Sequence, residues 1–458
     1  MEQQVITELK RLLGHQYVMD QLEDRICYSF DATFRDFPPD VVVKPGSVEE
    51  VAAVIKLAGQ YEIPVTARGA ATGLSGGSVP VKGGISLVLT RLNRIIEIDT
   101  ANRVAVVEAG VITEDFINAV YQAGLFYPPD PASAKTSTIG GNIAECAGGP
   151  RGVKYGITRD YVLGLEVVLP DGTIIEAGNR IDSEMAGPDW GMLLVGSEGT
   201  LGIVTKAYLR LVDKPQAKQT LLAIFNSLDD AACTVSGMIA AGTIPTTLEI
   251  MDNQTICAVE DYLQAGLPVK AEAILLIEVD GSEVSIIKQT EHVMKVCRQW
   301  GATEIQVAST PADSDKLWRA RKAISPACGK INPTKISEDA TVPRSQIPAM
   351  VRRLREIAQK YDLKMVIFGH AGDGNLHPNI LSNKHNHQEM ERVEQAVEEL
   401  FKAALELGGT LSGEHGIGYM KAPFLKWETG ETGFTAGQKL KAVVDPQGVL
   451  NPGKLFTA

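Results

Sequence analysis

Glycine is concentrated in three loops of the first half of the chain, each beside a predicted β-strand. The first, residues 67–78, follows the strand 64–66 and holds four glycines and three hydroxyl residues in twelve positions. The second spans 128–156, and the third, 196–202, precedes a strand. Glycine permits positive φ and lets backbone N–H groups gather around an anion such as pyrophosphate. One such loop alone is weak evidence, because a flexible surface segment is the alternative, but three in one region predict a large phosphate-bearing cofactor.

The sequence around these loops predicts a mixed helix and sheet fold. Ser47 and Glu50 form a capping box before the apolar helical stripe 51–58, which lies between the strands 41–43 and 64–66 as a βαβ unit. A further helix is expected over 116–120, and further strands are expected at 85–89, 104–108, 161–169 and 202–211. Beyond Lys214 the pattern changes to an α+β arrangement, with strands near 221–225, 272–279, 303–307 and 364–368 and helices near 229–241, 283–300, 346–360 and 388–407. The tail, 410–458, is predicted to be rich in loops.

Charge and cysteine usage exclude several classes of protein. The 44 basic and 56 acidic side chains give a net charge of −12, which argues against binding nucleic acid through bulk electrostatics. The first residues form a short amphipathic helix and not a signal peptide, and no apolar run approaches a membrane span, so a cytoplasmic protein is expected. Six cysteines contain no CxxC motif, so no four-cysteine iron–sulfur cluster is expected.

Two dense motifs in the second half contain three of the seven histidines. His370 and His377 are separated by a glycine-rich turn, and Glu414 and His415 are consecutive. Two imidazoles and a carboxylate, with positions left open, suit Zn²⁺, Fe²⁺ or Mn²⁺. Histidines that hydrogen-bond within turns are the structural alternative. Asp373, inside the first turn, is expected to form an Asx turn and not to bind a metal.

The chain lacks G-x-G-x-x-G, so the nicotinamide dinucleotide fingerprint is missing. The segments PVTARGAATGLSGGSVP, PPDPASAKTSTIGGN, YGITRDYVLGLEVVLPDG and GSEGTLGIVT instead resemble the FAD-binding domain of the vanillyl-alcohol-oxidase (PCMH) type. The chain is most similar to the branch with the glycolate oxidase catalytic subunit, D-lactate dehydrogenase and D-2-hydroxyglutarate dehydrogenase. The resemblance covers nearly the whole chain, from about residue 38 to Lys454.

The resemblance implies an α+β architecture with a two-subdomain FAD-binding domain, a cap domain for substrate, and a C-terminal return to the FAD domain. The expected segments are an N-terminal helical segment 1–37, the FAD domain 38–214, the cap 215–409, and a C-terminal segment 410–458 that completes the active site. The first loop has no histidine, so FAD is expected to bind non-covalently. The implied FAD-binding residues are Arg68, Gly69, Ala70, Ala71, Thr72, Gly73, Leu74, Ser75, Pro131, Ser137, Thr138, Gly140, Gly141, Asn142, Gly148, Gly149, Tyr155, Gly156, Glu198, Gly199, Gly202, Ile203 and Asn451.

The resemblance also implies that His370, His377 and Glu414 are ligands of one divalent metal ion. His415 cannot easily point at the same ion as Glu414 beside it, so it is the expected general base. Arg321 matches a carboxylate-binding arginine, and Asn379 matches a substrate-holding position. The relatives that act on hydroxyglutarate use a further lysine, and Ser337 stands at its place here, which favours a short monocarboxylate.

The expected function is FAD-dependent oxidation of a small D-2-hydroxy acid, glycolate or D-lactate, to the 2-oxo acid. Electrons would pass to an iron–sulfur subunit, an electron-transferring flavoprotein or a quinone pathway, and a homodimer is compatible with the sequence. The alternatives are a D-2-hydroxyglutarate dehydrogenase, a zinc hydrolase using the His₂Glu site, and a non-catalytic flavin-binding subunit.

Overall fold

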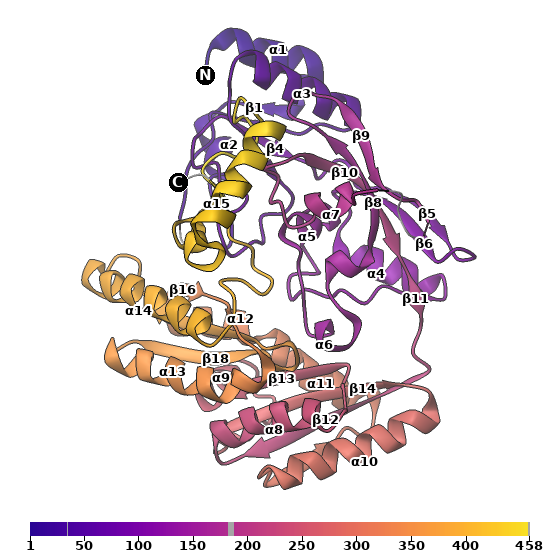
Figure 1. Ribbon diagram of the computed structural model, residues 1–458, viewed down its shortest axis with the longest axis vertical. Helices are drawn as coiled ribbons and strands as arrows, with labels where there is room; N and C mark the ends of the chain where they lie inside the picture. The colour runs from indigo at the N-terminus through magenta and orange to yellow at the C-terminus, as the bar shows by residue number, and fades with distance from the viewer. Residues whose placement is uncertain (34, 182–186, 457–458) are drawn as a thin grey trace. The chain divides into compact units, whose positions relative to one another are not determined.

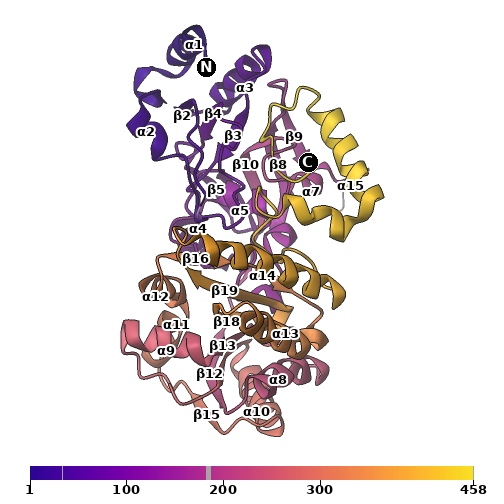
Figure 2. The same ribbon diagram turned by 90° about the vertical axis from the view of Figure 1, so that its left-hand side faces the viewer.

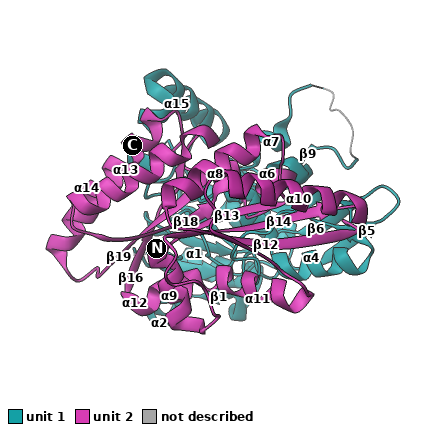
Figure 3. Ribbon diagram, turned by 90° about the horizontal axis from the view of Figure 1, so that it is seen from below, with its two compact units in different colours: residues 1–147, 157–214, 414–458 teal, residues 148–156, 215–413 magenta. Residues whose placement is uncertain are grey.

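The computed structural model describes residues 1–33, 35–181 and 187–456. These residues form two compact units built from non-contiguous stretches (Figure 3). Unit 1 contains 1–147, 157–214 and 414–458, and unit 2 contains 148–156 and 215–413. The chain passes from unit 1 to unit 2 after Lys214 and returns to unit 1 at Glu414.

Unit 1 contains two main sheets (Figure 1). The four-stranded sheet has the order β1-β2-β4-β3, in which β2, β4 and β3 are parallel and β1 is antiparallel to β2. Its strands are β1 (Val18–Met19), β2 (Val41–Val43), β3 (Val65–Arg68) and β4 (Ile85–Val88), and its neighbouring helices are α1 (Gln3–Leu13), α2 (Leu22–Ile26) and α3 (Val48–Gln60). α1 buries Val5, Leu9 and Leu13 in the same core as β2 and β4, so the N-terminal helix is part of unit 1.

The second sheet of unit 1 is antiparallel, with the order β5-β6-β10-β8-β9. Its strands are β5 (Ile95–Asp99), β6 (Val104–Glu108), β8 (Val162–Val168), β9 (Ile174–Gly178) and β10 (Ile203–Arg210), and a short pair joins β7 (Leu125–Phe126) to β11 (Val212–Asp213). The helices of this part are α4 (Thr113–Gln122), α5 (Ile139–Glu145), α7 (Trp190–Leu194) and α15 (Leu425–Val444). The prediction of a loop-rich tail was wrong, because α15 runs through it with a kink at Gly430.

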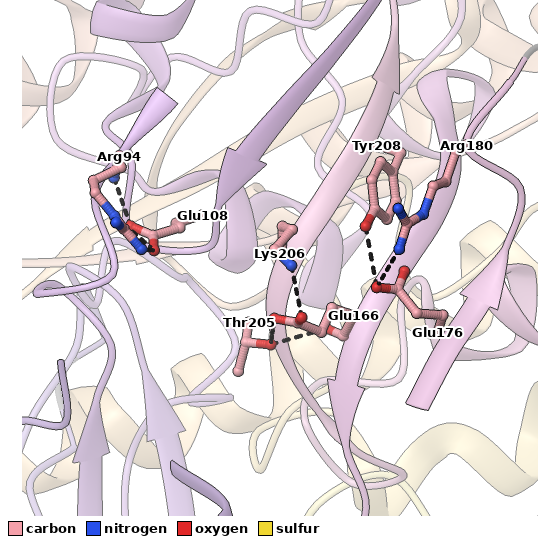
Figure 4. A network of polar contacts seen from close by, with 8 residues as sticks. All are labelled: Arg94, Glu108, Glu166, Glu176, Arg180, Thr205, Lys206 and Tyr208. Carbon is pink, nitrogen blue, oxygen red and sulfur yellow. Dashed lines mark hydrogen bonds and ion pairs between the residues drawn. The ribbon is translucent and has the colours of Figure 1, made fainter. Parts of the chain in front are cut away.

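A polar network ties the strands of this second sheet together (Figure 4). Glu166 of β8 accepts hydrogen bonds from Thr205 and Lys206 of β10, at 2.9 and 2.6 Å. Glu176 of β9 accepts one from the hydroxyl of Tyr208, at 3.1 Å, and burial followed by this bond raises the pKa of Tyr208 to about 12. These cross-strand pairs fix the register of β8, β9 and β10, the strands beside the third glycine loop.

Unit 2 is one sheet with helices on both faces (Figure 2). Its main order is β15-β12-β14-β13-β18-β19-β16, and β17 also pairs with β19. The strands are β12 (Ala217–Phe225), β13 (Thr247–Asp252), β14 (Ala273–Gly281), β15 (Glu304–Val307), β16 (Thr334–Ser337), β17 (Ala340–Thr341), β18 (Lys364–His370) and β19 (Asn375–Ser382). The helices are α6 (Gly152–Tyr155), α8 (Leu228–Ala240), α9 (Asn253–Leu263), α10 (Glu283–Gln299), α11 (Pro311–Lys322), α12 (Ile324–Ile331), α13 (Ile347–Lys360) and α14 (His387–Glu406).

One face of this sheet is covered by α9, α11 and α12, which share an apolar core with Met251, Val366 and Phe368 of its central strands. Helices α8, α10 and α13 also pack on strands of the sheet, and α14 packs on α13. Within the described residues, no helix is both long enough and apolar enough to cross a membrane.

Candidate functional site

A cavity in unit 1 is bounded by all three glycine loops. Its empty volume is about 1280 Å³, a figure that includes the part of the cavity open to solvent. The predicted FAD-binding residues that line it are Arg68, Gly69, Ala70, Ala71, Thr72, Gly73, Leu74, Pro131, Ser137, Thr138, Gly140, Gly141, Asn142, Glu198, Gly199, Gly202 and Ile203.

The walls of the cavity require small residues. The first loop leaves the carboxyl end of β3 and turns with a left-handed residue at Ala71, whose φ is 54°. A Cβ added at Gly69 would collide with the hydroxyl of Thr138 in the second loop. A Cβ at Gly140 would lie 2.6 Å from the Cβ of Ala109 and 2.9 Å from its carbonyl oxygen. The loops therefore pack closely around a space lined with backbone, and these residues fit a cofactor that carries phosphate and a flat ring.

Six predicted FAD-binding residues lie outside the cavity lining. Ser75 is buried, and its carbonyl accepts a hydrogen bond from the N–H of Met420. Asn451 donates to the carbonyls of Gly77 and Glu198, at 2.9 and 2.7 Å. It therefore links the first and third glycine loops without lining the cavity. The remaining four belong to unit 2 and are Gly148, Gly149, Tyr155 and Gly156. The hydroxyl of Tyr155 donates to Asp280 of unit 2, at 2.9 Å.

Glu414 and His415 also line the cavity of unit 1. The C-terminal return that the sequence predicts thus brings both residues to the space formed by the glycine loops. Sequence reasoning missed Glu145, which lines the same cavity at the end of α5. A single acidic residue within the small-residue segment 140–149 is the signal that could have identified it.

In unit 2, His370 and His377 come together on the hairpin of β18 and β19. A turn closed by Gly374, whose φ is 89°, joins the strands. The imidazole centroids lie 4.9 Å apart with ring planes at 87°, and one ring nitrogen of each residue lies within 4.8 Å of the other. Both side chains are buried. The spacing of the motif therefore produces a close pair of imidazoles.

Each imidazole has a buried carboxylate beside its Nδ1 atom. Glu249 of β13, the register partner of His370, places Oε1 2.6 Å from Nδ1 of His370. Asp339 places Oδ1 3.3 Å from Nδ1 of His377. Carboxylates at Nδ1 are the usual outer partners of metal-binding histidines, because they leave Nε2 to face the ion. The donor set of unit 2 fits a divalent metal.

Glu249 also pairs with Arg321 of α11. Nε of Arg321 donates to Oε2 of Glu249 at 2.6 Å, and Nη2 lies 2.5 Å from the same oxygen. Burial alone would raise the pKa of Glu249, but the charges and hydrogen bonds of Arg321 and His370 outweigh it and lower that pKa. Arg321, expected to bind substrate, is thus also part of a buried network. Glu249 was missed by sequence reasoning, although a lone acid within the apolar run 248–251 was visible.

Asp339 connects the histidine pair to the end of unit 2. Its Oδ2 accepts hydrogen bonds from the hydroxyl of Ser412, at 3.0 Å, and from the N–H of Gly413, at 3.1 Å. Gly413 is the last residue of unit 2, and Glu414 follows it directly. One carboxylate therefore contacts a predicted ligand and fixes the backbone that leads to the next two predicted site residues.

Asn379 is fully buried on β19, where its amide donates to the carbonyl of His377 at 3.1 Å. Its register partner on β16 is Ser337, the residue at the place of the relatives' lysine. Nearby Lys335 donates to the hydroxyl of Ser325 at 2.7 Å, and burial lowers its pKa.

Two family models match the chain. Residues 39–178 match "FAD binding domain", and residues 214–455 match "FAD linked oxidases, C-terminal domain". The chain is 48% identical to the glycolate oxidase subunit GlcD of Bacillus subtilis (strain 168), over 98% of this chain and 96% of that protein. It is 36% identical to the D-lactate dehydrogenase of Anaerostipes hadrus, over 96% of this chain and 94% of that protein.

The fold is also that of p-cresol methylhydroxylase, solved with substrate bound. The TM-score is 0.84 at 18% identity, and the match covers 99% of this chain and 96% of that one. At this identity the likeness concerns the fold alone. Together with the two family models and a cavity walled by glycine loops, it leads to one conclusion: the chain belongs to the FAD-linked oxidases with a PCMH-type FAD-binding domain and is an FAD-dependent oxidoreductase.

Proposed function

We propose that this protein oxidises a small D-2-hydroxy acid, glycolate or D-lactate, to the corresponding 2-oxo acid. The names of the two relatives, a glycolate oxidase subunit and a D-lactate dehydrogenase, support this class of substrate. The observation that carries the proposal is the buried pair His370–His377 with a carboxylate at each Nδ1. Such a pair is suited to activating a hydroxyl group through a metal ion.

We further propose that His370, His377 and Glu414 hold one divalent ion, Zn²⁺, Fe²⁺ or Mn²⁺. The hydrogen bond from Gly413 to Asp339 supports this, because consecutive Cα atoms are only about 3.8 Å apart and Glu414 must start beside the anchored residue. When bound, the ion would act as a Lewis acid that lowers the pKa of the substrate hydroxyl. FAD, when bound, supplies the acceptor for the hydride from the substrate carbon.

The protein's own residues then have separate tasks. His415 removes the hydroxyl proton, since an imidazole titrates near neutral pH and this one lines the FAD cavity. Arg321 and Asn379 position the substrate carboxylate. Arg321 can serve both Glu249 and a substrate, because a guanidinium has five N–H donors and the pair with Glu249 engages Nε and Nη2. Holding the acid in one orientation supplies much of the rate enhancement.

Ser337 favours a monocarboxylate over D-2-hydroxyglutarate. It pairs in register with Asn379, so the β16 position opposite this predicted substrate-binding residue carries a hydroxyl group and no cation. Lys335, the cation two residues away, donates its hydrogen bond to Ser325. A second, distal carboxylate would therefore lack the positive partner that it requires.

Electrons leave the reduced cofactor to an external acceptor, for which we propose an iron–sulfur subunit, an electron-transferring flavoprotein or a quinone pathway. The six cysteines are free thiols at scattered positions of the described chain, and none stands in a cluster-binding motif. Stopped-flow reoxidation with and without oxygen tests this. Fast reoxidation by oxygen alone would identify an oxidase instead.

Anaerobic bleaching of the flavin by a panel of D- and L-2-hydroxy acids tests the substrate. We expect glycolate and D-lactate to bleach the visible absorption of the oxidised flavin and D-2-hydroxyglutarate to leave that absorption unchanged. His370→Ala should lose the metal and turnover while the protein stays yellow, with the exposed His385→Ala as the matched control. Full turnover by metal-free His370→Ala would refute the role of the ion.

The same experiments separate the other two classes. A zinc hydrolase would turn over its substrate without flavin reduction and would be isolated colourless. A non-catalytic flavin-binding subunit would be yellow, and none of the acids would bleach it.

A further inference from the structure

Unit 1 contains a pair of acidic side chains whose environments differ, although both line the FAD cavity. Glu145 ends α5, and Glu198 stands in the third glycine loop. A Cβ added at Gly416 would collide with Oε2 of Glu145 and would lie 3.0 Å from Oε1 of Glu198. Both carboxyl groups therefore face the same short piece of backbone, directly after His415.

Glu198 is anchored by two backbone donors. Its Oε1 accepts from the N–H of Ile417 and its Oε2 from the N–H of Gly418, each at 2.7 Å. Two charge-assisted bonds of this kind stabilise a carboxylate, even though burial raises the pKa of Glu198.

Glu145 lacks such donors. Its Oε2 is buried and has no hydrogen-bond partner among the described residues, and its Oε1 would lie 2.5 Å from a Cβ added at Gly77. A buried carboxylate without a donor is strongly disfavoured in its charged form. Burial, then the charges of Glu198 and Asp31, raise the pKa of Glu145 well above its ordinary value, while Lys454 and Lys421 act in the opposite direction.

We propose that Glu145 carries a proton in the oxidised enzyme and donates it to the flavin when the flavin is reduced. The position of Glu145 in the cavity wall, its unpartnered buried oxygen and the anchored carboxylate of Glu198 beside it carry this inference. In the step, the O–H bond of Glu145 breaks and an N–H bond forms on the reduced isoalloxazine. The negative charge left by the hydride passes from the ring to the carboxylate, and reoxidation returns the proton.

The test uses the holoenzyme reduced by light in the absence of oxygen, with a sacrificial electron donor supplying the two electrons, so that it does not depend on the identity of the substrate. Infrared difference spectra of the oxidised and reduced protein should show a protonated carboxyl band that disappears on reduction. Glu145→Gln keeps an N–H donor of similar shape but cannot release a proton. We expect this variant to lack the band and to hold anionic reduced flavin at a pH where the wild type holds the neutral form.

Glu166→Gln is the matched control, because Glu166 lies in the cross-strand network of β8 and β10 and does not line the cavity. It should keep both the infrared change and the neutral reduced flavin. The proposal is overturned if the wild type shows no carboxyl change, if the band survives in Glu145→Gln, or if that variant also forms neutral reduced flavin. The wild-type infrared measurement decides the first point even if the variant binds no FAD.

Discussion

Removing either partner of the buried ion pair between Arg321 and Glu249 should be among the most destabilising single substitutions in unit 2. The side chain of Arg321 is 7% exposed and that of Glu249 is fully buried, so removing either partner leaves an uncompensated charge in the interior. Breaking a buried pair in this way typically costs about 3–5 kcal/mol. With an m-value near 2–3 kcal/mol/M, that corresponds to a decrease of roughly 1–2 M in the urea midpoint.

Urea unfolding of Arg321→Met, Glu249→Gln and the double variant measures this contribution. Each single change should lower the midpoint by the stated amount. The double variant should lose about 2–3 kcal/mol less than the sum of the two, because it leaves no isolated charge. Glu249→Gln should in addition weaken metal binding by roughly 10–100-fold, since Glu249 also contacts His370. Arg321→Met should affect the metal less.

The surface pair Arg353–Glu406 provides the control. Its side chains are 47% and 63% exposed, and such pairs contribute about 0–1 kcal/mol. If Glu249→Gln destabilises the protein no more than Glu406→Gln does, or if the losses of the two single variants at the buried pair are strictly additive, the coupling inferred from the geometry is refuted.

Two further predictions concern one site in each unit. Gly140→Ala should weaken FAD binding at least tenfold, measured by fluorescence titration, because its Cβ meets the backbone of Ala109; Gly329→Ala, where a Cβ meets nothing within 4 Å, should bind FAD normally. In unit 2, burial raises the pKa of Asp252 to about 6 from an ordinary 3.8. The folded state thus holds the proton more tightly, and the destabilisation present above pH 6 is relieved as the pH falls towards 4. Wild type should therefore gain stability relative to Asp252→Asn between pH 7.5 and 5, by about 1.4 kcal/mol, because only the one pH unit between 6 and 5 lies below the folded-state pKa and each unit contributes about 1.36 kcal/mol; an unchanged difference in urea midpoints would contradict this.

Local patterns were enough to predict much of the fold. The three consecutive valines at 41–43 form β2 with the predicted bounds, and the Ser47 cap begins α3, where its hydroxyl accepts from the N–H of Glu50. The glycine loops could be predicted from the sequence because backbone segments that approach each other closely require glycine in any fold. The tail was misread, because glycines at 430, 433 and 437 suggested loops where packing stabilises α15.

The site was predictable only where it consists of short motifs. His370 and His377 lie seven residues apart, and a hairpin must bring them together. Glu249 and Glu145 could not be assigned, because each is a single acid in an apolar or small-residue segment, and its partner lies far along the chain. His370 follows Glu249 by 121 positions, and that pairing exists only through the register of β13 with β18.

The bonds from Asn451 to Gly77 and Glu198 have a consequence for biosynthesis. Two loops are held by an amide that the ribosome adds much later, 253 positions after the nearer of them. The nascent polypeptide can form its first strands and helices long before that, as domains commonly do during translation. A polypeptide interrupted upstream of this asparagine would leave the cofactor pocket unfinished, so flavin loading should follow the synthesis of Asn451.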